Sequence, residues 1–285
     1  MGRKQILERE RRWAPAAGYA AILVAPLYIG SLFILTSTVT FGGLPTEQLR
    51  LAEENSSTLI LSSVMNALAA ALMCIPLLYL FKAAQARSER ISSAMVGFVF
   101  IGPLLLALRS LLSAISQDQI ASDFVAQSGP GGDIYTLLDD LAEGSTIAEV
   151  AGSLFFPAVL GLVVAMVYTS LQAMRVGLLS RFFGTLGMAL GGALVVIAPQ
   201  LSLLAISIWM GWLGFLFLDR VPRGRPPAWA AGEAIPWPKP GVQPAEPTPA
   251  VVEGDATEAF SASESSADHS LRRERARKKK RKRRG

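Results

Sequence analysis

Residues 155–168 read FFPAVLGLVVAMVY, a run of apolar side chains without any charge. The run lies inside a longer apolar stretch, residues 149–172, and five similar stretches occur along the chain, at about 16–39, 57–81, 92–115, 182–199 and 201–218. A helix needs about 20 predominantly apolar residues to cross roughly 30 Å of hydrocarbon. None of the stretches alternates with a period of two, which argues against strands. The sequence therefore predicts an all-α integral membrane protein, a six-helix bundle over residues 16–218.

The composition supports the membrane class and excludes several kinds of site. Hydrophobic residues make up 51% of the 285 residues, a proportion that points to membrane rather than to one or two soluble domains. The only cysteine, Cys74, lies in the second apolar stretch, so no intrachain disulfide can form. The only histidine, His269, lies in the C-terminal tail, which excludes a histidine-based triad or metal site from the bundle. No cofactor is predicted.

The basic residues are confined almost entirely to every second loop. Of the 27 Lys and Arg residues, 25 lie in the N-terminal leader (residues 1–15), in the loops after the second, fourth and sixth stretches, and in the C-terminal tail. The opposite loops are acidic, and residues 116–148 hold no Lys or Arg. Because basic loops remain on the cytoplasmic side, both termini are predicted to be cytoplasmic. The first stretch is interpreted as a retained signal anchor, since it is too long for a typical cleaved signal.

Proline residues punctuate the predicted spans. The fifth and sixth spans are separated only by Ala198-Pro199-Gln200, and proline cannot continue a helix interior without losing a hydrogen bond. A tight helical hairpin is therefore predicted, because one long kinked helix would place Arg181 and Arg220 on opposite sides of the membrane. Kinks are also predicted within three other spans, at Pro76, Pro103 and Pro157.

Arg109 is the only basic residue inside a predicted span. A charge at a helix centre costs about 2.5–3.5 kcal/mol on insertion scales, so such residues usually have a partner or a water-filled cavity. Arg109 is about six residues, or ~9 Å, from the outer end of its span, a distance over which an arginine side chain can snorkel. Two interpretations compete. One is a structural arginine that either snorkels to the interface or pairs with Glu149, or with Asp139 or Asp140; the other is a ligand or anion site.

Two further features of the spans concern helix packing. Asn66 lies within the second span, where its amide is interpreted as a hydrogen-bonding group between helices and, less readily, as a substrate ligand. Gly184, Gly187 and Gly191 share one face of the fifth span, which permits close approach of another helix of the same chain. In the outer loop 116–148, a turn cluster at residues 129–133 separates two apolar patterns with helical spacing, which predict two short amphipathic helices on the outer surface.

The C-terminal tail has two parts. Residues 219–271 are rich in Pro, Ala, Glu and Ser and are predicted to form a disordered linker. A polybasic tract, residues 272–285, follows and holds Arg272, Arg273, Arg275, Arg277, Lys278, Lys279, Lys280, Arg281, Lys282, Arg283 and Arg284. The favoured partner of the tract is the anionic lipid of the adjacent bilayer, at about 1 kcal/mol per basic residue. Nucleic acid phosphates are a weaker alternative, because aromatic residues are not interleaved with the basic ones. In the third interpretation the tract stays in solvent and only anchors the topology.

Two segments resemble a family of uncharacterised actinobacterial multi-pass membrane proteins. They are residues 170–187, SLQAMRVGLLSRFFGTLG, and residues 224–229, GRPPAW, followed by Glu233 and Pro236-Trp237-Pro238. The basic C-terminus fits the same family, and the resemblance covers most of the chain. It implies a location in a bacterial plasma membrane. The family has no established activity, so the resemblance assigns no functional residue.

The leading functional hypothesis is a non-enzymatic scaffold or regulatory membrane protein whose tail contacts lipid head groups or an unidentified protein partner. The alternative is a small-solute transporter or channel. Arg109 and the prolines favour transport, but no Asp or Glu lies deep in a span to carry coupling protons. An enzyme is disfavoured, since HExxH, GxSxG and paired deep carboxylates are absent from the sequence. A cavity reaching Arg109 favours transport, and a filled bundle favours scaffolding.

Overall fold

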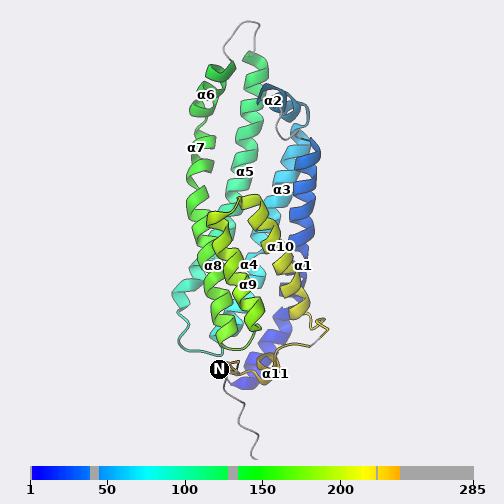
Figure 1. Ribbon diagram of the computed structural model, residues 1–285, viewed down its shortest axis with the longest axis vertical. Helices are drawn as coiled ribbons and strands as arrows, with labels where there is room; N and C mark the ends of the chain where they lie inside the picture. Colours follow the sequence, from blue (N-terminus) through cyan, green and yellow to red (C-terminus); the bar gives the residue numbers. More distant parts are fainter. Residues whose placement is uncertain (1, 39–44, 128–133, 223, 238–285) are drawn as a thin grey trace, which may run out of the picture. The chain divides into compact units, whose positions relative to one another are not determined.

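The computed structural model describes residues 2–38, 45–127, 134–222 and 224–237 (Figure 1). The turn cluster at residues 129–133, most of the predicted linker and the whole polybasic tract (Arg272 to Arg284) lie outside these ranges. The predicted disorder and lipid contact of the tail therefore remain predictions.

Within the described ranges every regular element is a helix, so the all-α prediction is confirmed for this part of the chain. The elements are α1 (Arg3–Thr38), α2 (Pro45–Glu54), α3 (Ser56–Leu72), α4 (Cys74–Gln85), the short 3-10 helix η1 (Ser93–Met95), α5 (Val96–Gln127), α6 (Ile134–Gly144), α7 (Thr146–Ser153), α8 (Phe155–Arg175), α9 (Arg181–Val196), α10 (Pro199–Phe217) and α11 (Pro227–Ala231).

Five helical segments of the described chain are long and apolar enough to cross a membrane, as expected of a multi-pass membrane protein. They are α1, α3 with α4, η1 with α5, α7 with α8, and α10. The remaining predicted span, α9, is apolar but has only 16 residues. At 1.5 Å per residue α9 is about 24 Å long, which is shorter than the hydrocarbon core.

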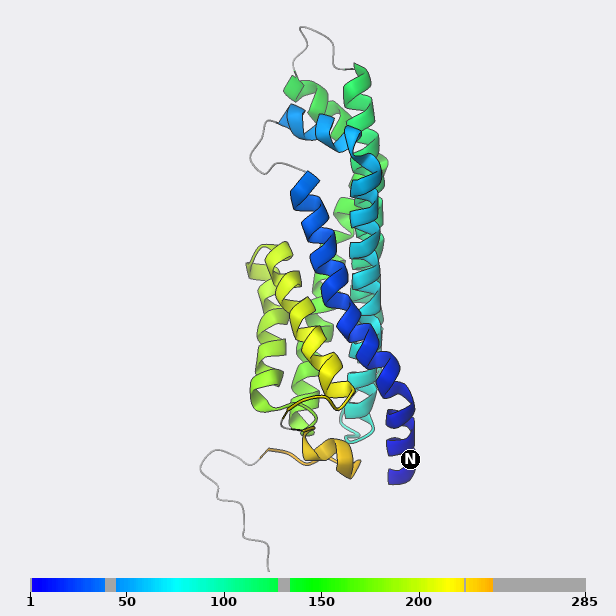
Figure 2. The same ribbon diagram turned by 90° about the vertical axis from the view of Figure 1, so that its right-hand side faces the viewer.

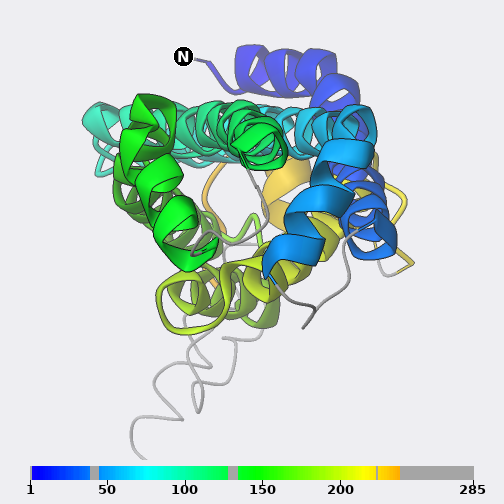
Figure 3. The ribbon, with the colours of Figure 1, turned by 90° about the horizontal axis from the view of Figure 1, so that it is seen from above.

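The long helices pack as a closed ring. α1 contacts α3, α3 contacts α5, α5 contacts α8, α8 contacts α9, α9 contacts α10, and α10 returns to α1 (Figure 3). The α9–α10 hairpin covers only part of the bundle's length, while α5 and α7 continue beyond its tip (Figures 1 and 2). The hairpin tip therefore lies beside the middle of the longer helices.

The basic loops gather at one end of the bundle, here called the basic end. The start of α1, the loops after α4 and α8, and the segment after α10 all lie there (Figure 1). Hydrogen bonds join them, since the Arg87 side chain donates to the Ala228 carbonyl and the Trp229 indole donates to the Leu178 carbonyl. α2, α6 and the end of α5 lie at the opposite end, here called the acidic end. The alternation of charge along the sequence thus corresponds to two ends of one bundle.

Two of the three predicted proline kinks coincide with breaks between helices. α3 ends at Leu72, four residues before Pro76, and α7 ends at Ser153, four residues before Pro157. Proline has no backbone N–H, so the carbonyl four residues before it lacks its usual hydrogen-bond donor, and the proline ring also clashes with that carbonyl. α5 continues through Pro103 without such a break.

The structure differs from the sequence-based prediction in two segments. The first of the two amphipathic helices expected in the loop 116–148 is the continuation of α5, which buries Ala121 and Phe124. No glycine or proline ends the helix before Gln127, so extending α5 satisfies the backbone without a turn. The linker predicted to be disordered from residue 219 instead begins with an ordered segment, residues 224–237, that contains α11 and the buried Trp229.

Glycines bring the helices of the ring into backbone contact. Gly184, Gly187 and Gly191 are buried on α9, and a Cβ atom at each would meet an α8 side chain at 2.9 Å or less. A closer crossing, which no pattern in the sequence predicts, joins α5 and α8. An added Cβ on Gly102 would lie 2.3 Å from the Leu162 backbone nitrogen, and one on Gly161 would lie 2.8 Å from the Gly102 Cα.

Candidate functional site

A small pocket with both polar and apolar walls lies beside the tip of the α9–α10 hairpin. Its volume is about 100 Å³. Side chains from α1, α3, α5, α8, α9 and α10 line it, and the polar ones are Tyr28, Asn66, Arg109, Ser110 and Gln200. The structure thus brings Asn66 and Arg109, two residues singled out from separate spans, to one cavity. We call this cavity the Arg109 pocket.

Arg109 has an aromatic neighbour in place of the predicted carboxylate. Its Cζ lies 4.9 Å from the centroid of the Phe155 ring, in a cation–π contact. The Arg109 Nε is buried and has no hydrogen-bond partner in the described chain. Cation–π contacts contribute about 0.5–2 kcal/mol, so the ring offsets part of the cost of burying the guanidinium.

The predicted pairing of Arg109 with Glu149, Asp139 or Asp140 is wrong for the described structure. No ion pair joins Arg109 to any described residue, and all three carboxylates are exposed. Glu149 lies on α7, ahead of the break at Leu154, while Phe155 begins α8 and lines the pocket. An exposed carboxylate keeps its hydration, which a buried ion pair would have to give up.

Some of the polar groups around Arg109 form hydrogen bonds between helices. The Tyr28 hydroxyl donates to the Gln200 carbonyl at 3.0 Å, which ties α1 to the start of α10. The Ser110 hydroxyl donates to the Ser63 carbonyl at 3.3 Å, which ties α5 to α3. The half-buried Asn66 amide makes no hydrogen bond to another described residue. Asn66, Arg109 and the side-chain amide of Gln200 therefore retain hydrogen-bonding capacity at the pocket.

The pocket presents hydrogen-bond donors and a positive charge, which a small anion could accept. The Arg109 guanidinium has a buried donor and no counter-charge in the described part of the chain, and such a group attracts an anion where the dielectric constant is low. The volume corresponds to about three water molecules at ~30 Å³ each. A monovalent anion of a few heavy atoms matches both the charge and the space.

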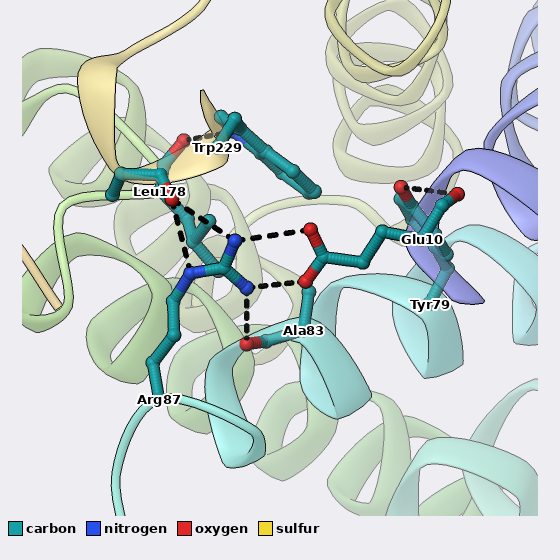
Figure 4. A network of polar contacts seen from close by, with 7 residues as sticks. Glu10, Tyr79, Ala83, Arg87, Leu178 and Trp229 are labelled. Carbon is teal, nitrogen blue, oxygen red and sulfur yellow. Dashed lines mark hydrogen bonds and ion pairs between the residues drawn. The ribbon is translucent and has the colours of Figure 1, made fainter. Parts of the chain in front are cut away.

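A second polar cluster lies at the basic end and is here called the basic-end network (Figure 4). Its centre is an ion pair in which both terminal nitrogens of Arg87 donate to the two carboxylate oxygens of Glu10. The Arg87 side chain is fully buried and that of Glu10 is 11% exposed. The same guanidinium donates to the carbonyls of Ala83 and Ala228. Every donor direction of Arg87 is thus occupied by α1, α4 or the segment after α10.

Trp229 is the aromatic part of the network. Its indole N–H donates to the Leu178 carbonyl at 2.9 Å, and its ring lies 5.6 Å from Arg87 Cζ and 5.4 Å from Arg225 Cζ. The ring also stacks on Tyr79, with centroids 5.8 Å apart. The tryptophan therefore connects α4 and the loop after α8 with the segment that follows α10.

The rest of the ordered segment is fixed by backbone-directed hydrogen bonds. The Ile235 N–H donates to the Val176 carbonyl at 3.2 Å, and the Trp237 indole donates to the Leu179 carbonyl at 2.8 Å. Gly177 permits this contact, because its φ is +80° and a Cβ there would lie 2.0 Å from the Ile235 oxygen. Residues 224–237 are docked on the basic end through these bonds.

Comparisons with known proteins found no matching family model, no matching curated protein and no matching solved structure. The resemblance to actinobacterial membrane proteins therefore stays a prediction.

Proposed function

We propose that the chain is a six-span protein of a bacterial plasma membrane, with both termini in the cytoplasm. Five apolar helices of sufficient length, the apolar α9 and the gathering of basic loops at one end support this arrangement. α9 and α10 then form a short hairpin whose tip lies within the outer part of the bilayer. The Arg109 pocket lies at that depth.

The function we propose is passage of a small monovalent anion through the bundle, as in a transporter or channel. The observation that carries it is the Arg109 pocket, where a guanidinium that has no counter-charge among the described residues lines a cavity shared by six helices. A purely structural arginine is normally paired or snorkels to the interface. The predicted spans hold no deep carboxylate for proton coupling, so passive movement is the form proposed.

Replacing Arg109 by glutamine is expected to slow anion passage by about tenfold to a hundredfold, because a charge-assisted hydrogen bond contributes about 1.5–3 kcal/mol. The measurement is influx of chloride, nitrate and formate into proteoliposomes, followed with an anion-sensitive dye or electrode. The matched control is Arg50→Gln, since Arg50 is exposed on α2. The proposal fails if vesicles with wild-type protein admit all three anions no faster than empty vesicles, or if Arg109→Gln matches wild type.

A second function is favoured by the docked segment, residues 224–237. We propose that docking fixes the point at which the tail leaves the membrane surface, as a scaffold that presents the tail to a partner requires. The hydrogen bonds from Ile235 and Trp237 support this proposal. It does not depend on the Arg109 pocket.

Replacing Gly177 by alanine is expected to release the docked segment, because the added Cβ would collide with the Ile235 oxygen at a positive φ. Hydrogen–deuterium exchange of residues 227–237 should become faster by at least about tenfold. Gly192→Ala is the control, since a Cβ there meets nothing within 4 Å. The scaffold proposal is tested by cross-linking the tail to its neighbours in cells. The set of cross-linked proteins should differ between wild type and Gly177→Ala. If the segment is released but the set of cross-linked proteins is identical, the scaffold proposal is wrong.

A further inference from the structure

A groove between α1 and α4 adjoins the basic-end network and shares Glu10 and Tyr79 with it. Its volume is about 340 Å³, within the usual range of ligand pockets of ~300–1,000 Å³. The groove is here called the α1–α4 groove, and it is lined mainly by Arg9, Trp13, Ala16, Ile75, Leu78 and Lys82. It is separate from the Arg109 pocket, with which it shares no lining residue.

The groove has a charged end and an apolar end. α1 begins at the basic end and α4 finishes there, so Arg9 and Lys82 lie nearer that end than Ala16 and Ile75 do. The other walls are mainly alkyl and aromatic side chains, including Phe100 of α5. Under the proposed placement in the membrane, the charged end is at the cytoplasmic head-group level and the rest is in hydrocarbon.

The charge available at the groove is positive. Glu10 lines it, but both carboxylate oxygens accept hydrogen bonds from the buried Arg87, so that acid is already neutralised. Arg9 is exposed and makes no ion pair with a described residue. Lys82 donates one hydrogen bond to the Gln85 side chain at 3.0 Å, which leaves other ammonium protons available. Two cations therefore face an occupant without competing acids.

We propose that the α1–α4 groove binds one anionic phospholipid of the cytoplasmic leaflet. The phosphate lies between Arg9 and Lys82, and an acyl chain lies along Ala16, Ile75 and Leu78. Trp13 is 56% exposed, and a tryptophan at this depth suits the boundary between head groups and hydrocarbon. Charge complementarity and the apolar depth together select a lipid over a free anion, which would leave the apolar wall uncovered. The inference rests on the proposed membrane placement and not on anion passage.

The experiment is photo-cross-linking in nanodiscs that contain equal amounts of phosphatidylglycerol and phosphatidylcholine. The full-length chain carries benzoylphenylalanine in place of Trp13, and mass spectrometry of the protein gives the ratio of the two lipid adducts. Phosphatidylglycerol is expected to predominate. The combined change Arg9→Gln and Lys82→Gln should lower the ratio of phosphatidylglycerol to phosphatidylcholine adducts by about thirtyfold. This is the effect expected when two basic residues that contact anionic head groups are lost.

Two matched variants separate the groove from general surface charge. Arg11→Gln with Arg12→Gln removes two exposed cations of the same helix that do not line the groove, and the lipid preference should persist. Ala16→Phe fills the apolar part and should reduce all lipid adducts while leaving the cations in place. Equal loss of preference in the Arg11/Arg12 variant would overturn the proposal. So would wild-type adducts without preference, or cross-links to a second copy of the chain in place of lipid.

Discussion

Replacing Gly102 by alanine is expected to lower the melting temperature of the detergent-solubilised protein by about 6–12 °C. The new Cβ would lie 2.3 Å from the Leu162 nitrogen and 2.5 Å from the Gly161 carbonyl carbon. Both are backbone atoms, so relief requires α5 and α8 to separate. Overpacking costs typically about 1–3 kcal/mol, and an effect at the upper end corresponds to this shift for a domain of this size. Thermal unfolding followed by size-exclusion chromatography measures it.

The control for Gly102 lies on the same helix. A Cβ at Gly97 would meet only the end of the Ile101 side chain, at 3.9 Å. Alanine is intrinsically better than glycine in a helix interior by about 1 kcal/mol, so Gly97→Ala should leave the melting temperature unchanged or raise it. The two substitutions are chemically identical, yet only Gly102→Ala is expected to lower the melting temperature. Equal shifts would mean that the α5–α8 crossing is not the cause.

The second large effect is expected at the basic-end network. Replacing Arg87 by alanine leaves the Glu10 carboxylate buried without its partner, and breaking a buried ion pair in this way costs about 3–5 kcal/mol. The carbonyls of Ala83 and Ala228 lose a donor as well. A fall of about 6–20 °C in melting temperature should follow, together with faster hydrogen–deuterium exchange in residues 227–237.

A double-mutant cycle distinguishes the ion pair from a general loss of packing. The double variant Glu10→Ala with Arg87→Ala should be less destabilised than the sum of the two single variants, because no unpaired charge remains. Arg90→Ala is the control, since Arg90 is exposed in the same loop and surface substitutions change stability by about 0.5 kcal/mol or less. Additive effects of the two single changes would show that Glu10 and Arg87 are not energetically coupled.

The long helices were predictable because apolar length and charge alternation are local properties of the chain. The breaks at Met73 and Leu154 follow from Pro76 and Pro157 in the same way. The basic-end network is different in kind. Glu10 and Arg87 are 77 positions apart, and the leader offers Glu8 as an equal candidate, so no pattern in one sequence selects the pair. In the sequence, Arg87 is one of the basic loop residues, and these indicate only the orientation in the membrane.

Two predictions differ from the structure for physical reasons that residue patterns do not reveal. For a structural Arg109 the sequence predicts a carboxylate partner, but the candidate acids stay exposed and hydrated, and the Phe155 ring contacts the guanidinium instead. The linker was expected to be disordered because its composition, averaged over residues 219–271, is poor in apolar side chains. Two tryptophans near its start are enough to dock it, because each indole also donates to a backbone carbonyl of the loop after α8.

The closed ring of helices has a consequence for the order of biosynthesis. α1 precedes the other described helices in the chain, and its ring neighbours are α3 and α10. One side of α1 therefore stays uncovered in the lipid until synthesis has passed residue 217, the end of α10. Trp229 arrives only after that point and connects the loop after α8 to Arg87. A nascent chain halted within α9 would hold most of its spans yet lack both the closing helix and the residue that secures the basic end.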